Sequence, residues 1–489
     1  MKETILVIDT GSSSMRGILF DMAGKPLFIS QIQYTMTVGD DGSAVMDAQI
    51  FRDTLVQLAK NASEEIRAKG YHLSAISLDS QRSSVLAVDE HVNPLYPILM
   101  WYDKRCSDIC TDFSSTDQQT IFRLCGMRVT PVSSAPKMLW MKRYLPDIYQ
   151  KAYKLIGIHD YLLYQITGRL VTDATCACRT ALMDIKTFQW SQPLLDLFEI
   201  DRDKLCRILP GGSLVGQVTK AFCALTGLPQ VPVVSAGGDQ QCCILGQHLT
   251  DAGVISVNSG SASYLSIPVS RPILDAHMEV NLSAYYGRNP WILEASNMGS
   301  GTVYQWFNRT FYRENQNPKD VTRINQEVAA QFPGCQGLIC FPDFAGRGCP
   351  STNPHARGMF FGAGLQHTRG DFARAILEGI CFDIDSCVRY IRASGVAITR
   401  IQSTGGLTRF DTFNQILSDI SGLPVMVNAE SETTAVGAWL AACDALALPR
   451  RGTENPSPKV YFPIPDHQAV YAQAAQTRNR IRKDLADRP

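Results

Sequence analysis

Residues 5–14 read Ile-Leu-Val-Ile-Asp-Thr-Gly-Ser-Ser-Ser, an apolar strand followed by a small, hydroxyl-rich turn. Residues 254–263 repeat this pattern as Val-Ile-Ser-Val-Asn-Ser-Gly-Ser-Ala-Ser. We call these segments the first and second glycine-serine turns. A buried strand that ends in such a turn offers backbone N–H and side-chain hydroxyl groups to an anion. Either turn alone is compatible with an ordinary hairpin. Two copies, one near the start of each half, favour two similar domains that hold one polyphosphate between them.

Length and charge exclude several classes of protein. The chain has 489 residues, enough for two or three domains with sizeable cores. Lys+Arg and Asp+Glu each number 46, so no net positive charge draws the chain to nucleic acid or to an acidic membrane. No apolar stretch approaches the length of a membrane span, and the N-terminus lacks a hydrophobic signal region. We therefore expect a cytoplasmic protein with neither nucleic-acid nor membrane partners.

The cysteines and the C-terminal basic residues favour structural roles. The 15 cysteines are scattered, often inside apolar runs, and none forms a Cys-x-x-Cys pair. We expect reduced, mostly buried thiols; a metal site is the less favoured alternative. The basic run at residues 478–483 lies in a polar segment and is expected to form the solvated face of a helix.

Strand and helix signals follow one another in the same order twice. In the first half, strand patterns precede a helical pattern at residues 50–70, and a buried strand at residues 73–78 follows. The pattern restarts near residue 253. Mixed elements of this kind build layered α/β domains with helices over a sheet. We place the domains at residues 1–248 and 249–489, with the boundary near residues 246–252.

Two aspartates stand where phosphate-transfer chemistry would need them. Asp239 follows the strand at residues 231–235 and three small residues, at the start of a helical pattern. This position suits a base for an acceptor hydroxyl, and it equally suits a helix N-cap. Asp9 ends the first strand and would face phosphates, a repulsive position unless Mg²⁺ lies between them.

Longer motifs resemble the FGGY family of carbohydrate kinases over nearly the whole chain. Residues 356–379 closely match the family's C-terminal signature, residues 134–141 are similar to the N-terminal one, and residues 237–241 and 405–406 also match. The resemblance implies an α/β fold with two actin-like ATPase (ribonuclease H-like) domains around a central cleft. It further implies ATP-dependent phosphorylation of a small sugar or polyol, with a pentulose- or hexulose-type acceptor favoured. Sugar and base would belong to the first domain and the nucleotide to the second. Family members often form dimers or tetramers, so a homodimer is one expected assembly.

The resemblance also assigns roles to single residues. Asp239 would be the catalytic base, and Asp9 would hold Mg²⁺. Gly405 and Gly406 would border the adenine, although a plain tight turn is the alternative. The expected phosphate contacts are Gly11, Ser12, Ser13, Arg16, Ser259, Gly260 and Ser261. Arg16 is equally compatible with a surface cation.

The acceptor site is the least defined part of the sequence. The expected substrate contacts are Gln81, Arg82, Trp101, Asp103 and Asp239. Some family members have Arg-Glu at the positions of Arg82 and Ser83, and others have Met-His. This chain keeps the arginine and lacks the glutamate and the histidine. Glycerol and xylulose are therefore both doubtful acceptors.

Two other functions are compatible with this fold class. The unusual turn at residues 81–83 permits a non-catalytic, sugar-responsive regulator on a kinase scaffold, although the intact Asp9 and Asp239 argue against it. An actin- or chaperone-like ATPase shares the fold class by analogy only. The absence of a client-binding β domain after the second half makes that function unfavoured.

Overall fold

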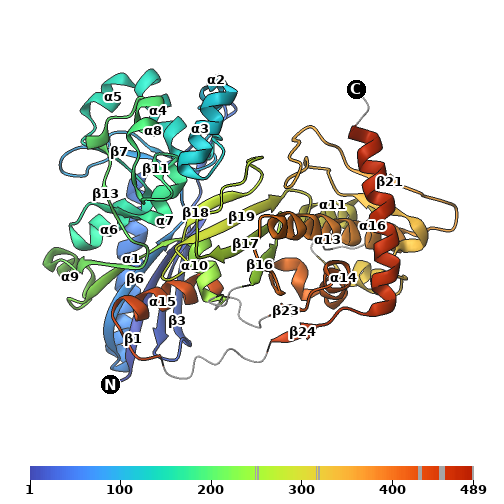
Figure 1. Cartoon of the computed structure of the whole chain (residues 1–489). Helices are drawn as coiled ribbons and strands as arrows, with labels where there is room; N and C mark the ends of the chain where they lie inside the picture. Colours follow the sequence, from blue (N-terminus) through green and yellow to red (C-terminus); the bar gives the residue numbers. More distant parts are fainter. Residues whose placement is uncertain are drawn as a thin grey trace.

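The computed structural model of the chain shows two lobes side by side (Figure 1). It describes residues 1–247, 249, 253–314, 317, 320–427, 432–450 and 458–486. The predicted boundary at residues 248/249 falls partly outside the described residues, because residue 248 and residues 250–252 are not among them. The two-domain α/β class predicted from the sequence is confirmed.

The first lobe is built on a six-stranded sheet in the order β14-β15-β6-β1-β2-β3. Its strands are β1 (Glu3–Thr10), β2 (Ser14–Asp21), β3 (Pro26–Gln33), β6 (His72–Ser80), β14 (Ser213–Gln217) and β15 (Pro232–Gly238). The central strands β1, β6 and β15 run parallel, and the outer pairings are antiparallel. The carboxyl ends of the three parallel strands therefore meet at one edge of the sheet, as expected for a ligand site in an open α/β sheet.

Helices cover both faces of this sheet because its central strands are apolar on both sides. Leu6 and Ile8 pack toward α1, whereas Ile5 and Val7 pack toward α15. One face carries α1 (Ala48–Lys69) and α6 (Ile158–Thr167), with α9 (Lys220–Thr226) beside α1; the other carries α10 (Asp239–Gly246) and α15 (Thr433–Ala445). Asp47 caps the first turn of α1, and Gly70 ends that helix in the left-handed conformation.

A smaller cap extends the first lobe. Its elements include those that surround a separate apolar cluster containing Leu99, Ile121 and Phe198. They are β4 (Thr37–Val38), β5 (Ala44–Met46), β7 (Leu86–Val88), β8 (Ile98–Leu99), β9 (Lys154–Ile156), β10 (Val171–Asp173), β11 (Met183–Asp184), β12 (Gln189–Trp190), β13 (Arg207–Leu209), α2 (Ser107–Asp112), α3 (Ser115–Cys125), α4 (Ser134–Tyr144), α5 (Pro146–Lys151), α7 (Ala174–Ala177) and α8 (Gln192–Leu197). In Figure 1, α2, α3, α4 and α5 lie at the top of this lobe, far from the N-terminus.

The second lobe repeats the plan with a seven-stranded sheet in the order β18-β19-β17-β16-β22-β23-β24. Its strands are β16 (Val254–Ser259), β17 (Ser263–Val269), β18 (Asn281–Ala284), β19 (Trp291–Asn297), β22 (Arg400–Thr404), β23 (Val425–Val427) and β24 (Lys459–Tyr461), with β20 (Ile339–Phe341) and β21 (Met359–Phe361) as a separate pair. Its helices are α11 (Gly301–Phe311), α12 (Thr322–Ala329), α13 (Arg369–Ala393), α14 (Asp411–Ser421) and α16 (Pro465–Ala486). The long, mostly buried helix α13 supplies much of this core.

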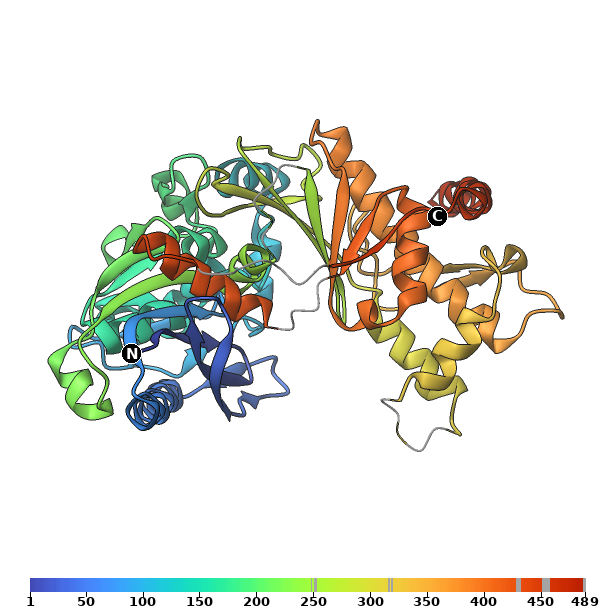
Figure 2. The same cartoon turned by 90° about the horizontal axis from the view of Figure 1, so that it is seen from below.

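Helix α15 returns to the first lobe although it lies late in the sequence. Figures 1 and 2 both place it among the elements of the first lobe, and it packs on β1, β6 and β15. Its crossing with α10 requires glycine on both helices. A Cβ at Gly437 would lie 1.8 Å from the carbonyl oxygen of Cys242, and one at Gly246 would lie 1.8 Å from that of Thr433. The close helix pair therefore lies within the first lobe, and the second half of the chain crosses to that lobe to supply α15.

The expectation of a solvated basic face on the C-terminal helix is partly wrong. Arg478 is only 2% exposed; its guanidinium lies over the rings of Phe341 and Phe382 and donates to Asp383 at 2.6 Å. Arg482, one turn later, donates to the same carboxylate at 2.8 Å. A periodic run of positive charge can therefore anchor a helix when a carboxylate lies beneath it. Arg480 and Lys483, the other two basic residues of the run, are exposed as expected.

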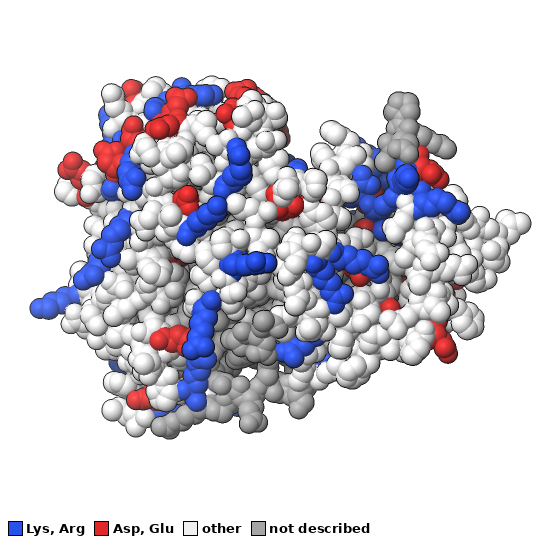
Figure 3. Space-filling view, in the orientation of Figure 1, with Lys and Arg blue, Asp and Glu red and all other residues white. Residues whose placement is uncertain are grey.

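Other bulk expectations can be compared directly with the structure. All 15 cysteines are free and most are buried, which confirms the prediction of reduced, packed thiols. Acidic and basic side chains occur on both lobes of the face drawn in Figure 3. Among the described residues, no helix combines the length and the apolar composition that a membrane span requires.

Candidate active site

A cleft of about 490 Å³ receives side chains from both lobes. From the first lobe come Ser12, Arg82, Trp101 and Asp239, and from the second come Tyr264, Glu294 and Met298. The structure therefore brings the first glycine-serine turn, the predicted base and the predicted acceptor turn together in one hollow.

Asp239 stands at the end of β15 and opens α10. The two preceding glycines are required by close approaches: a Cβ at Gly237 would lie 2.2 Å from the Thr175 hydroxyl, and one at Gly238 would lie 2.4 Å from Cδ of Arg82. The Asp239 side chain is partly exposed to the cleft, and its Oδ1 accepts the Gln240 N–H at 2.7 Å. Burial, opposed by the charge of Arg82, raises the pKa of Asp239 above its ordinary value. A raised pKa makes this carboxylate a stronger base than an exposed aspartate.

Arg82 connects Asp239 to a carboxylate from the other lobe. Its Nε lies 3.7 Å from Asp239 Oδ1 and its Nη2 lies 3.8 Å from Oε1 of Glu294 on β19. These gaps exceed hydrogen-bonding distance, and the buried Nη1 of Arg82 has no partner among the described residues. Arg82 therefore keeps donor capacity that a bound molecule could use.

Arg179 and Glu294 are site residues that the sequence analysis did not identify. Arg179 Nη1 lies 3.9 Å from Oε2 of Glu294, so this carboxylate stands between two guanidinium groups. Burial, and after it the charge of Arg82, lowers the pKa of Arg179. Glu294 occupies the acceptor cleft where Ser83 leaves no carboxylate. A charged residue inside the apolar strand pattern of residues 291–297 is the signal that could have marked it.

Asp9 and Asp79 lie side by side on neighbouring strands. They are register partners in the parallel pairing of β1 and β6, and Gly237 of β15 pairs with Asp79 on its other side. Asp9 accepts a hydrogen bond from Arg16 Nε at 3.1 Å, and Arg16 also pairs with Glu432. Burial, and then the charges of Asp9 and Asp239, raises the pKa of Asp79 well above its ordinary value. The sequence analysis gave Asp79 no role.

The first glycine-serine turn is held in place by its surroundings. The Gly11 N–H donates to the Ser14 carbonyl at 2.9 Å, and the Tyr34 hydroxyl donates to the Gly11 carbonyl at 2.6 Å. The Trp101 indole N–H donates to the Ser12 hydroxyl at 2.8 Å, so Trp101 links the turn to the wall of the cleft. Ser13 is exposed. Gln81 lines the cleft, and its N–H donates to the Thr10 carbonyl at 2.8 Å.

The second glycine-serine turn lies against the Gly405–Gly406 pair. β16 and β22 run parallel, with Asn258 opposite Thr404. A Cβ at Gly405 would lie 2.6 Å from the Ser259 carbonyl carbon, and its φ of +94° also favours glycine. The Ser261 carbonyl accepts the Thr302 hydroxyl at 2.7 Å, which ties the turn to α11. The turn residues Ser259 and Gly260 and the expected adenine-bordering glycines are therefore neighbours.

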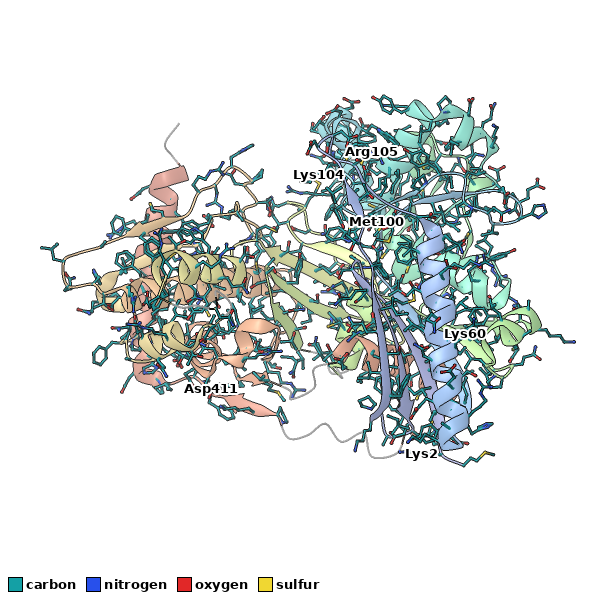
Figure 4. The ribbon with its side chains drawn as sticks, turned by 180° about the vertical axis from the view of Figure 1, so that it is seen from behind. Lys2, Lys60, Met100, Lys104, Arg105 and Asp411 are labelled. Atoms are coloured by element: carbon teal, nitrogen blue, oxygen red, sulfur yellow. The ribbon has the colours of Figure 1, made fainter. Side chains whose placement is uncertain are left out.

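Asp103 is not among the residues that line the cleft, unlike the other expected acceptor contacts. It is 1% exposed, and its Oδ2 accepts the Ala44 N–H at 2.9 Å and Nη2 of Arg105 at 2.7 Å. These contacts saturate its carboxylate and hold the loop after Trp101. Figure 4 shows Arg105 with Met100 and Lys104 on that loop, at the opposite end of the lobe from Lys2.

One buried group among the described residues has the composition of a metal site. The ligand atoms of His159, Asp173 and Cys176 lie within 4.8 Å of one another. Asp173 already accepts the Thr175 N–H at 2.7 Å and the Ser235 hydroxyl at 2.5 Å, and that hydroxyl lies 2.8 Å from His159 Nε2. These hydrogen bonds account for the group as internal support of β15 beneath the cleft.

Comparison with known proteins gives consistent matches over both lobes. Residues 4–246 match the model of the FGGY family of carbohydrate kinases, N-terminal domain, and residues 265–446 match its C-terminal domain. A glycerol kinase of Rhodospirillum centenum is 30% identical over 446 residues, which cover 89% of this chain and 88% of the relative. A gluconokinase of Bacillus subtilis is 26% identical over 452 residues, covering 90% and 87%. The crystal structure of xylulose kinase from Lactobacillus acidophilus has a TM-score of 0.91 at 25% identity and covers 99% of both chains.

Proposed function

Because the chain belongs to the FGGY family of carbohydrate kinases, we propose that its cleft transfers the γ-phosphoryl group of ATP to a hydroxyl of a pentulose, a hexulose or a related small sugar derivative. The single observation that carries this proposal is the position of Asp239. The Asp239 carboxylate, whose pKa is raised, lines a cleft that also receives Ser12 from the first glycine-serine turn.

Phosphoryl transfer asks the protein mainly for alignment, charge neutralisation and a base. Asp239 accepts the proton of the acceptor hydroxyl as the new O–P bond forms. Arg82, which lines the same cleft and keeps one nitrogen without a partner among the described residues, orients the acceptor oxygens. The two glycine-serine turns, with Gly405 and Gly406, hold the nucleotide. Closure of the lobes excludes water, so ATP hydrolysis without acceptor is slow.

The residues of the first sheet edge fit a bound Mg²⁺. Mg²⁺ prefers carboxylate and water oxygens. Asp9 and Asp79 offer adjacent carboxylates, and that of Asp79 has no hydrogen-bond partner among the described residues. Asp9 would hold the ion. When bound, Mg²⁺ neutralises charge on the transferred phosphates.

Glu294 supplies the acceptor carboxylate that the turn at Arg82 and Ser83 lacks. It enters from β19 of the second lobe and faces both Arg82 and Arg179. We therefore assign acceptor recognition to both lobes, with hydroxyl groups donating to Glu294 and accepting from the two arginines.

An ADP-release screen tests the proposal. Matched pentuloses, hexuloses, polyols and aldonates, each with ATP and Mg²⁺, should include at least one acceptor that raises ADP release well above the sugar-free rate. Sugar binding without ADP release from any member would favour the regulator instead, and rapid sugar-independent hydrolysis would contradict the closed cleft. Cytoplasmic location and a homodimer stay predictions; light scattering after gel filtration measures the latter.

A further inference from the structure

Asp79 is fully buried, and no N–H or O–H donor among the described residues reaches its carboxyl group. It is 0% exposed, and neither carboxylate oxygen has a partner among the described residues. Asp173 provides a comparison inside the same lobe. It is equally buried, yet it caps α7 through the Thr175 N–H at 2.7 Å and binds the Ser235 hydroxyl at 2.5 Å. A buried polar group left unsatisfied costs folding free energy, so an unpartnered carboxyl in a well-packed sheet calls for a functional explanation.

The surroundings of Asp79 are rich in carboxylate oxygens that can coordinate a metal ion. Asp9 is the register partner of Asp79 on β1, and Gly237 is its register partner on β15. Asp239 follows Gly237 by two residues. The nearest cations lie beside other carboxylates: Arg16 pairs with Asp9 and Glu432, and Arg82 lies 3.7 Å from Asp239 and 3.8 Å from Glu294. Three carboxylates thus converge at the carboxyl ends of these strands, and one of them, Asp239, lines the cleft. Oxygen-only donor sets of this kind match a small divalent cation.

We infer that Asp79 is a second protein ligand, beside Asp9, for the divalent cation that accompanies the nucleotide. This inference rests on the proposed kinase function. Two ligands in register on adjacent parallel strands hold the ion on rigid elements, whereas a single carboxylate at a strand end would leave its position to the nucleotide. An ion bound at Asp79 also explains why its carboxyl group lacks hydrogen-bond donors, because a donor would occupy the place of the ion.

Direct binding of Mn²⁺, followed by electron paramagnetic resonance on the full chain without nucleotide, tests the inference. We expect Asp79→Asn and Asp79→Ser each to weaken Mn²⁺ binding by about tenfold or more, since supporting groups of a metal site typically contribute 10–100-fold. Glu279→Gln is the matched control. Glu279 also lines the cleft, but its oxygens already accept from the Thr352 hydroxyl at 2.6 Å and Arg128 at 3.2 Å. Its Mn²⁺ affinity should equal that of the wild type.

Thermal melting separates a metal role from a folding role. Without metal, both Asp79 variants should melt no lower than the wild type, because each removes a buried unpartnered carboxyl; with Mn²⁺, they should gain less stabilisation than the wild type. Mn²⁺ affinity within twofold of the wild type in either folded variant overturns the inference. A wild type that binds Mn²⁺ but phosphorylates no acceptor would overturn the proposed function and leave the ion site standing.

Discussion

Two charge clusters in this protein are built in opposite ways. In the second lobe, Glu378 accepts hydrogen bonds from Arg374 Nε at 2.9 Å, the Tyr471 hydroxyl at 2.9 Å and the Gly334 N–H at 3.0 Å. We call this the closed cluster. In the cleft, the gaps from Arg82 and Arg179 to their carboxylates are 3.7–3.9 Å, and Arg82 keeps an unpartnered nitrogen. We call this the open cluster.

The difference separates a structural role from a binding role. A closed cluster satisfies its own groups, and here it fastens α16 to α13 and to the loop at Gly334. An open cluster leaves hydrogen-bonding groups that only a ligand can satisfy, and these unsatisfied groups lower the stability of the folded state. Mutations in the closed cluster should therefore change stability, and mutations in the open cluster should change turnover or substrate binding.

The largest effect on turnover should come from Asp239→Asn. The amide keeps the shape of the side chain and cannot accept the hydroxyl proton, so we expect kcat to fall by about 10²–10⁴-fold. Nucleotide affinity and melting temperature should stay near wild-type values. Steady-state ADP release and nucleotide titration measure both. Wild-type turnover in the variant would remove Asp239 from the base role.

In the closed cluster, Glu378→Gln should destabilise the fold by about 3–5 kcal/mol, because Arg374 would remain buried without its counter-charge. Urea unfolding of the wild type and the variant measures the change. Replacing both partners, by Arg374→Met with Glu378→Leu, should recover much of the loss. If Glu378→Gln lowers the free energy of unfolding by less than about 1 kcal/mol, the closed cluster stabilises the fold no more than an exposed ion pair does.

In the open cluster, Glu294→Gln should raise the KM for the acceptor by about tenfold, since a good hydrogen bond to a charged group contributes about 1.5–3 kcal/mol. The KM for ATP and the free energy of unfolding should change little. Glu279→Gln again serves as the control, because its carboxylate already accepts hydrogen bonds from Thr352 and Arg128. Equal changes in the two variants would show that Glu294 acts on the fold of the cleft rather than on the acceptor.

The smallest expected effect concerns pH. Asp239 must be ionised to accept a proton, and burial raises its pKa. Activity is therefore present above this raised pKa and is lost as pH falls through it. The acidic limb of kcat/KM for the acceptor should lie above the ordinary aspartate value of about 3.9. A limb at or below that value would contradict an electrostatically tuned base.

Much of the fold was predictable from local sequence. The strand at residues 5–8, the two glycine-serine turns and the long C-terminal helix follow from short-range patterns, and the family resemblance led to the two-domain fold and the kinase activity, which the comparisons confirm. The individual site assignments stay predictions. Arg478 shows the limit of the local pattern: its charged run indicated a solvated face, and only the position of Asp383 beneath it explains the burial.

The sequence by itself determined which segments become strands, turns and helices, because hydrophobic period and turn chemistry act over a few residues. Tertiary structure alone decided three features: that α15 packs on the first sheet, that Glu294 crosses from the second lobe to Arg82, and that Asp79 faces Asp9 without a partner. Each depends on strand register or helix packing between residues far apart in the chain, and no local pattern encodes that pairing.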